Sequence, residues 1–265
     1  MLTMGELQGF WSYQRTQIEY ISWERTYQTV QANSVTISAP SDNQENDLLF
    51  AYLLYECSDP PTTEPSCSGW TFFQRVRDTL LAAAILYKWC AASEAANYTF
   101  SHGDTPYGSM GGAILRFRNS IQKGHRPIRR VSPISGSPIY ATDNYYGNAD
   151  FGWSTDPLNV DVPGAIVLSL GAIRRAPNGV SYLNMYPSSV AGYTDLTGTL
   201  YIGGAYGGNN VGGGIGYQKF TEKGVALDGG SGDPPSIATG GGGIAGEVGP
   251  SNGLTYMFGQ LVMLI

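Results

Sequence analysis

The chain has 265 residues, and its 36 Gly and 15 Pro come with 12 % aromatic but only 14 % charged residues. This composition is typical of all-β proteins with many turns, and it excludes a helical bundle or a coiled coil. The formal net charge of −6 argues against a nucleic-acid partner, because binding to phosphates depends on counterion release by a basic face.

The longest apolar run covers residues 80–87, far short of the roughly 20 residues that a membrane-spanning helix needs. Met1 is not followed by a basic stretch and an apolar one, as in a signal peptide. We therefore expect a soluble, unprocessed protein with no membrane partner.

Short alternating or apolar runs separated by turn clusters recur along the chain, which indicates a β-sandwich or barrel rather than βαβ units. In residues 80–90 a helix competes, because Leu and Ala favour helices, but Tyr87 and Trp89 favour the strand. The predicted strands are residues 18–30, 34–38, 47–56, 70–73, 80–90, 98–101, 113–117, 165–173, 200–204, 214–221 and 256–265.

The predicted strand at residues 47–56 is apolar on both of its alternating faces. Leu48 and Phe50 begin one apolar set, and Leu49 and Ala51 begin the other. Successive side chains of a strand point to opposite faces of its sheet. We therefore expect this strand to be covered on both sides, either by a second layer or by a neighbouring subunit.

Glycine is concentrated near the C-terminus: residues 198–253 hold 20 glycines, whereas residues 1–110 hold five. Tracts such as residues 212–214 are predicted to be loops or flexible hairpin ends on a rigid sandwich. Residues 1–30, which include Trp11 and Trp23, are predicted to form an N-terminal arm and first strand ahead of a single domain at residues 31–265.

No motif of the sequence has the context that catalysis or cofactor binding needs. His102 and His125 are predicted to be solvated loop residues, because they lack the spacing of a metal site. Residues 241–246 spell GxGxxG, but they neither follow a predicted strand nor open a helix. We therefore expect no enzyme activity and no cofactor, although a carboxylate pair for glycoside hydrolysis can be spread anywhere along a chain.

Two other groups of residues have a structural and a functional interpretation. Cys57 and Cys67 flank a turn and could form a disulfide in an oxidising environment, but small buried free thiols are the commoner case. Asp42, Glu45 and Asp47 could offer oxygen ligands to calcium, but a solvated turn is favoured because the spacing is not that of an EF-hand. No metal is expected.

Charge is strongly segregated, because residues 116–130 hold six of the 15 basic residues and no acidic one. The rest of the chain then has a net charge of −6 − 6 = −12. The segment is either a docking loop for an acidic protein surface or a solvated basic loop. Its basic residues are Arg116, Arg118, Lys123, Arg126, Arg129 and Arg130.

Several segments together form one pattern: SVTI at 34–37, NDLLFA at 46–51, SGWT at 68–71, LYKW at 86–89, ASEAANYTF at 92–100, GGAI at 111–114 and PGAIVL at 163–168. This pattern resembles a widespread family of tailed-phage virion proteins, over residues 34–173. The family pattern has a glycine where this chain has Asn46, and Val-Ala where it has Trp89 and Cys90. Asn is the commonest substitute where a turn needs a positive φ, so we expect that conformation at Asn46.

The resemblance implies a jelly-roll-like antiparallel β-sandwich on the virion, as a capsid decoration (cement) protein or as a fibre or tail component. Large apolar side chains of the pattern, Trp70 and Phe100, are expected to fill the sandwich interior with Leu48 and Phe50. Lys88 and Glu94 lie on either side of a predicted hairpin turn, where they can pair.

The function expected first is non-enzymatic binding to the outer capsid surface, with the major capsid protein and further copies of the chain, as a dimer or trimer, as partners. The N-terminal arm and the glycine-rich loops would fill grooves between neighbours. The alternative is a fibre or receptor-binding protein whose residues 143–148 and 206–210 recognise host glycans.

Overall fold

The computed structural model describes residues 17–27, 32–57, 63–78, 81–103, 106–120, 125–132, 149–152, 158–175, 183–187, 194–195, 200–203, 210–226, 244–248 and 255–265. All regular structure in these residues is β, with no helix, and each strand pair formed among them is antiparallel. The predicted all-β antiparallel sandwich is confirmed. Jelly-roll connectivity stays a prediction.

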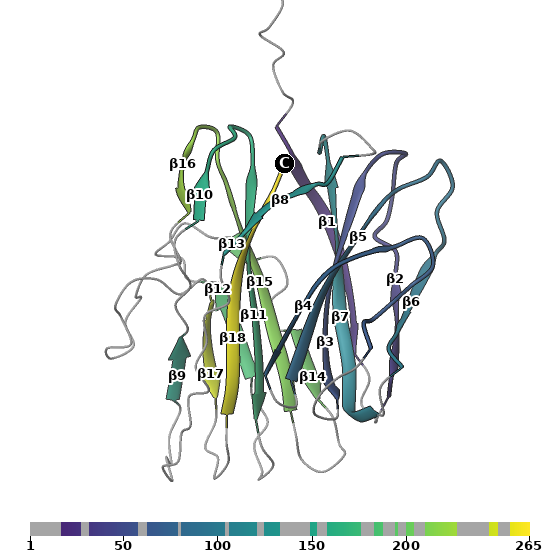
Figure 1. Ribbon diagram of the computed structural model, residues 1–265, viewed down its shortest axis with the longest axis vertical. Coiled ribbons are helices and arrows are strands. Elements are labelled where there is room, and N and C mark those ends of the chain that lie inside the picture. Colours follow the sequence, from purple (N-terminus) through teal and green to yellow (C-terminus); the bar gives the residue numbers. More distant parts are fainter. Residues whose placement is uncertain are drawn as a thin grey trace, which may run out of the picture.

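Two large sheets face each other across the centre of the molecule (Figure 1). The first sheet has the order β1 (Glu19–Tyr27), β7 (Pro106–Arg118), β3 (Leu48–Cys57), β5 (Leu81–Trp89) and β4 (Thr71–Asp78). The second has the order β13 (Thr194–Asp195), β15 (Asn210–Lys219), β11 (Ile166–Arg175), β18 (Thr255–Leu264) and β8 (Ile128–Val131), and β14 (Leu200–Gly203) also pairs with β15.

Smaller sheets flank these two. The pair β2 (Ser34–Ser38) and β6 (Asn97–Ser101) covers the outer face of the first sheet. The pair β10 (Leu158–Val160) and β16 (Gly224–Ala226) lies on the other side, by the second sheet, together with β12 (Leu183–Pro187), β17 (Ile244–Val248) and β9 (Ala149–Gly152) (Figure 1).

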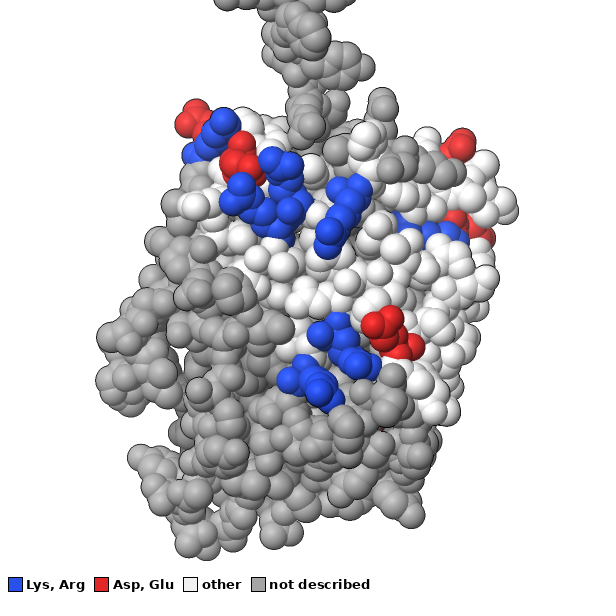
Figure 2. Space-filling view, viewed as in Figure 1, with Lys and Arg blue, Asp and Glu red and all other residues white. Residues whose placement is uncertain are grey.

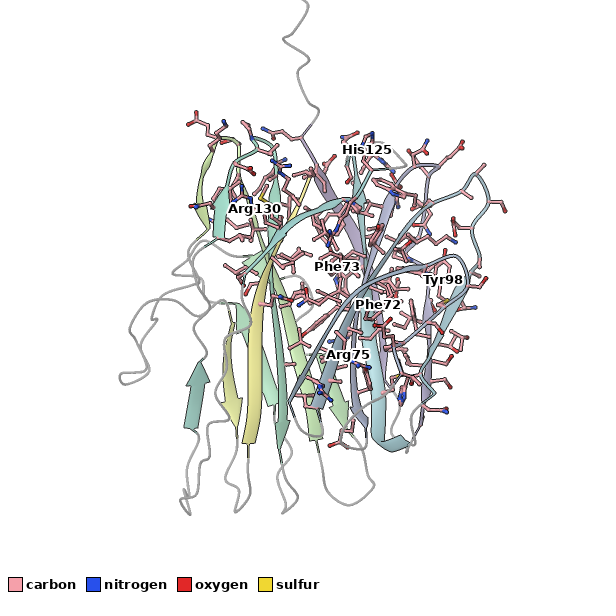
Figure 3. The ribbon with its side chains drawn as sticks, viewed as in Figure 1. Phe72, Phe73, Arg75, Tyr98, His125 and Arg130 are labelled. Carbon is pink, nitrogen blue, oxygen red and sulfur yellow. The ribbon has the colours of Figure 1, made fainter. Side chains whose placement is uncertain are left out.

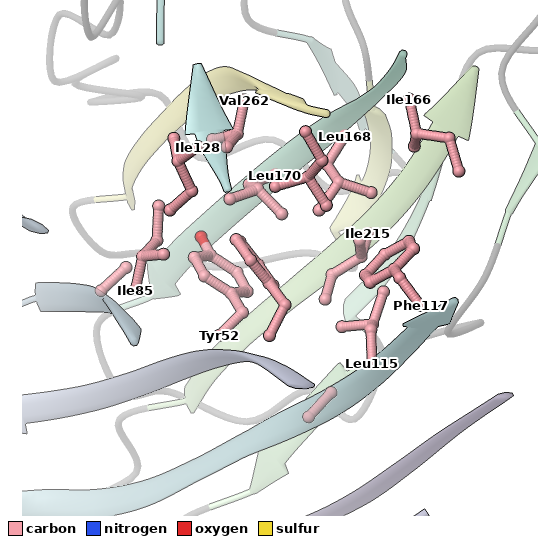
Figure 4. Close-up of a cluster of buried hydrophobic side chains, with 14 of the residues drawn as sticks. Tyr52, Ile85, Leu115, Phe117, Ile128, Ile166, Leu168, Leu170, Ile215 and Val262 are labelled. Atoms are coloured by element: carbon pink, nitrogen blue, oxygen red, sulfur yellow. The ribbon is translucent and has the colours of Figure 1, made fainter. Parts of the chain in front are cut away.

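The main core lies between the two large sheets (Figure 4). One face of β3, beginning with Leu48 and Phe50, packs there with the inner residues of the second sheet, such as Leu168 and Ile215. Leu48 and Phe50 are fully buried. Their burial follows from the alternation of side chains along β3, which directs every second residue to this interface.

The other face of β3 packs into a second cluster under β2 and β6. Leu49 and Leu53 meet Val35, Ile37 and Phe100 there, all essentially without solvent exposure. The prediction that this strand is covered on both faces is confirmed, and the cover is a second layer of the same chain. Phe100 and the partly buried Trp70 belong to this outer cluster rather than to the core between the large sheets.

Residues 81–89 form β5, so the helical alternative for this segment is wrong. Ala82 and Ala84 face the outer cluster while Ala83 and Ile85 face the main core. Small side chains let the layers approach this central strand from both sides, and pairing with β3 and β4 satisfies its backbone.

The turns of the resemblance pattern have the backbone geometry that its residues favour. Asn46 has a φ of 69°, which confirms the expectation for this substitute of glycine, and Gly69 and Gly164 have φ values of 78° and 82°. A positive φ is a left-handed backbone conformation, which Gly adopts without penalty and Asn with a small one.

The prediction that residues 212–214 form a loop or a hairpin end is wrong, because they lie inside β15. A Cβ atom on Gly213 would stand 2.6 Å from the carbonyl oxygen of Gly171 and would overlap the side chain of Leu54 on the facing sheet. These glycines therefore allow a close approach of strands within and between the sheets.

The first predicted strand is confirmed as β1, an edge strand of the first sheet that pairs with β7. Residues 1–16, and with them most of the predicted arm, lie outside the described residues. The domain boundary at residue 30 stays a prediction.

Candidate interaction surface

The basic segment of residues 116–130 is divided in the fold. Arg116 and Arg118 end β7, Arg126 lies in the connection that follows, and Arg129 and Arg130 belong to β8 of the other large sheet. Lys123 lies outside the described residues. The segment is therefore not one continuous loop surface.

Arg116 and Arg118 converge on one buried carboxylate, Asp47. The Nε of Arg116 donates to Asp47 Oδ2 at 2.7 Å, and the Nε of Arg118 donates to Oδ1 at 3.1 Å. The backbone N–H of Gln44 adds a third donor at 3.0 Å, and Arg116 also donates to the carbonyl oxygen of Ser41. We call Asp47, Arg116 and Arg118 the Asp47 cluster.

The Asp47 cluster has a structural role that corrects two expectations. Arg116 is only 2 % exposed, so it belongs neither to a docking surface nor to a solvated loop. Burial on its own would raise the pKa of Asp47, but hydrogen bonds from Arg118, Gln44 and Arg116 outweigh it and lower that pKa. Asp47 is therefore an ionised partner of arginine, which also removes it from the suggested calcium ligands and from a solvated turn.

Arg126, Arg129 and Arg130 are exposed, in contrast to Arg116. Arg129 and Arg130 each donate to Asp161 Oδ2 at 2.9 Å, yet their side chains keep exposed fractions of 46 % and 44 %. The guanidinium of Arg126 lies 4.4 Å from the ring centroid of Phe73 on β4, within the range of a cation–π contact.

Strand β4 brings two further arginines to the same side of the molecule. Arg75 and Arg77 alternate along this edge strand, and Arg75 donates to the carbonyl oxygen of Thr63. Figure 3 places Arg130, Phe73 and Arg75 in sequence down this side, and Figure 2 shows the lysine and arginine side chains gathered there in groups separated by uncharged surface.

We call Arg75, Arg77, Arg126, Arg129 and Arg130 the basic edge. Phe73 of β4 lies against Arg126, on the face of the strand opposite Arg75 and Arg77. Sequence reasoning missed the β4 half of the basic edge, because Arg75 and Arg77 lie far along the chain from residues 116–130. The alternating RVR at 75–77 was the available signal, since charged side chains that alternate on a strand are typical of a sheet edge.

The predicted pairing of Lys88 with Glu94 is confirmed, with Nζ and Oε2 2.7 Å apart. Glu94 also accepts hydrogen bonds from the hydroxyl of Tyr98 and the backbone N–H of Ala91. The ring of Trp70 packs edge-on against Tyr98, with centroids 5.1 Å apart. This network holds the β5–β6 connection against the sheet.

One histidine prediction is wrong. His102 is only 3 % exposed and stacks on Tyr55 with ring centroids 4.8 Å apart, so it is a core residue rather than a solvated one. His125 is exposed, as expected. In the described part of the chain no three His, Cys, Asp or Glu side chains are grouped to hold a metal ion.

Of the cysteines, Cys67 and Cys90 are free thiols. Burial raises the pKa of Cys90 to about 12, with nearby Glu94 and Asp47 adding to the shift, so this thiol stays protonated at neutral pH. The side chain of Cys57, residues 143–148 and residues 206–209 lie outside the described residues.

Comparison with known proteins identifies no relative: no family model, curated protein or solved structure matches the chain. Within the described residues, no helix is long and apolar enough to cross a membrane. The all-β antiparallel sandwich is shown by the strands and their pairing alone.

Proposed function

We propose that the chain is a non-enzymatic structural protein of a tailed-phage virion. In this proposal it is a capsid decoration protein that binds the outer surface of the shell and stabilises contacts between neighbouring capsomers. Its partners are the major capsid protein and further copies of itself, as a dimer or trimer.

The observation that supports this proposal best is where the residues of the phage-like pattern lie. Asn46, Gly69 and Gly164 form the positive-φ turns, Glu94 joins the β5–β6 connection to the sheet, and Phe50 is in the main core. Each of these residues has a scaffolding role in the sandwich. The resemblance therefore rests on residues that specify the sandwich fold, and a structural role in the virion is the function that this resemblance implies.

Copy number per particle tests the proposal. The particle that carries the chain is purified, and the protein is quantified by mass spectrometry with isotope-labelled peptides against the major capsid protein. A tail protein of the same particle serves as the low-copy control. Hundreds of copies are expected, because a decoration protein repeats over the shell lattice.

A few to a few dozen copies would overturn the capsid role in favour of a tail or fibre protein. Recognition of host glycans would then become the working hypothesis, with residues 143–148 and 206–210 as the loops to test. Absence from purified particles would overturn the virion proposal as a whole.

A further inference from the structure

We infer that the basic edge is the docking surface of this protein and that its occupant is an acidic patch on a partner protein. The inference rests on the proposed function for the partner's identity, which would be the major capsid protein. The sequence alone suggested the basic segment of residues 116–130 as the docking surface. The basic edge takes its place and is built from both large sheets.

The geometry assembles the basic edge from two sheets. Strand β4 is the last strand of the first sheet and β8 the last strand of the second, and Figure 1 shows both on the side facing the viewer. The stacking of Arg126 on Phe73 joins the connection before β8 to β4. Five arginines thus border one side of the sandwich.

The charge of this surface is opposite to that of the chain. Its five arginines are offset by Asp161 and by Glu64, which follows the Thr63 that accepts from Arg75. These seven residues carry a net charge of 5 − 2 = +3, whereas the whole chain carries −6. Such segregation orients a protein toward an acidic surface as it approaches.

The side-chain chemistry favours a protein over a nucleic acid. All five cations are arginines, whose planar guanidinium groups bind carboxylates through two parallel hydrogen bonds. The partly buried Phe73 lies against Arg126, and aromatic and arginine side chains together are typical of protein interfaces. The chain's net charge of −6 also repels a polyanion at long range.

The same features argue against two other occupants. A second copy related by a two-fold axis through this edge would place arginines against arginines. Addition of a strand to β4 is hindered by the bulge between Phe72 and Gln74 and by the charges of Arg75 and Arg77. Binding therefore proceeds through side chains.

The test uses charge reversal in the full-length protein. The edge variants are Arg77→Glu, Arg126→Glu and the double variant. The control is Arg25→Glu. Arg25 is exposed, its guanidinium lies 5.1 Å from the ring centroid of Trp23, and it belongs to β1, the edge strand of the first sheet opposite β4. The probes are purified shells that lack this protein, poly-L-glutamate, and double-stranded DNA, with sedimentation velocity to measure self-association.

We expect the Arg126→Glu and Arg77→Glu variants to bind shells at least about tenfold more weakly at physiological salt, with a larger loss in the double variant. The Arg25→Glu variant should bind as the wild type does. Poly-L-glutamate should bind weakly, and the variants should rank in the same order of affinity for it as for shells. Raised salt should weaken binding to shells and to poly-L-glutamate.

Equal shell binding by all variants would overturn the inference and leave the proposed function standing. If neither the wild type nor any variant binds shells, the proposed function fails. Binding to poly-L-glutamate then decides by itself whether the basic edge recognises carboxylates. Binding of DNA that depends on Arg77 and Arg126 would overturn the inference in favour of a nucleic acid. Dimerisation that depends on them would do so in favour of a second copy.

Discussion

At the scale of single residues, Asp47 is the side chain whose loss should matter most. It is the common acceptor of Arg116 and Arg118, and Arg116 is buried. Removing one partner of a buried ion pair leaves an uncompensated charge in the low-dielectric interior of the protein. Such a change typically costs about 3–5 kcal/mol.

We therefore predict that Asp47→Ala lowers the free energy of unfolding by about 3–5 kcal/mol, as measured by urea denaturation. Asp42→Asn is the matched control, because Asp42 is exposed and its φ of 56° suits Asn as well as Asp. Equal effects of the two variants would contradict a structural role for the Asp47 cluster.

Asp47 should also contribute to acid sensitivity. Its folded-state pKa is lowered, so the stability that it adds is present above roughly pH 4 and is lost as the pH falls through the folded-state pKa. Urea midpoints from pH 7 down to pH 3 should decline less steeply in Asp47→Asn than in the wild type. Parallel curves would contradict this assignment.

A single methyl group at Gly213 should destabilise the protein. Its Cβ would stand 2.6 Å from the carbonyl oxygen of Gly171, which is backbone and cannot move away easily. We expect Gly213→Ala to cost about 1–3 kcal/mol or more in thermal or urea unfolding. Gly103→Ala should cost less, because the nearest atoms there belong to the side chain of Thr63.

At the scale of elements, β3 is the strand on which two layers depend. Leu53 faces the cluster under β2 and β6, and Leu54 faces the core between the large sheets. Both are fully buried within one chain. Neither face needs a subunit to cover it.

We predict that Leu53→Ala and Leu54→Ala each lower the free energy of unfolding by about 2–5 kcal/mol. The effect should not depend on protein concentration over a hundredfold range, because both faces are covered within the chain. A Leu53→Ala penalty that grows on dilution would instead indicate that association of subunits contributes to this face.

The sequence predicted the long strands better than the short ones. The long apolar strands β3, β5, β11 and β18 were predicted, because their side chains carry a strong alternating or fully apolar pattern. Short strands such as β8, with the sequence IRRV, were missed. Pairing with β18 makes β8 a strand, and no periodicity can develop over four residues.

At the scale of the whole molecule, stability should decrease from the central layers outward. Strands β3 and β5 have neighbours on both sides in the first sheet and apolar clusters on both faces. Among the strands that the structure describes, β4 has a neighbour on one side, and β10 pairs with the short strand β16 alone.

Hydrogen exchange followed by mass spectrometry should therefore show the slowest exchange in peptides from β3 and β5. Peptides from β4 and β10 should exchange faster, because an edge strand or a two-stranded sheet can open without global unfolding. Protection in β10 equal to that in β3 would contradict this order of stability.

The sequence by itself determined the features that depend on near neighbours in the chain. The all-β class, the strand with two apolar faces, the positive φ of Asn46 and the Lys88–Glu94 pair were all predicted. Each follows from side-chain periodicity or from residues a few positions apart, and the physics of such features is local.

Only the tertiary structure decided which distant residues meet. Asp47 pairs with Arg116 across 69 positions of sequence, so one apparent docking residue became a buried structural one. Gly213 lies in a strand because β15 pairs with β11, and only glycine fits there because Leu54 of the facing sheet fills the space of a Cβ. The basic edge exists because β4 and β8 end two different sheets on the same side. Long-range packing sets these contacts, and no spacing along the chain encodes them.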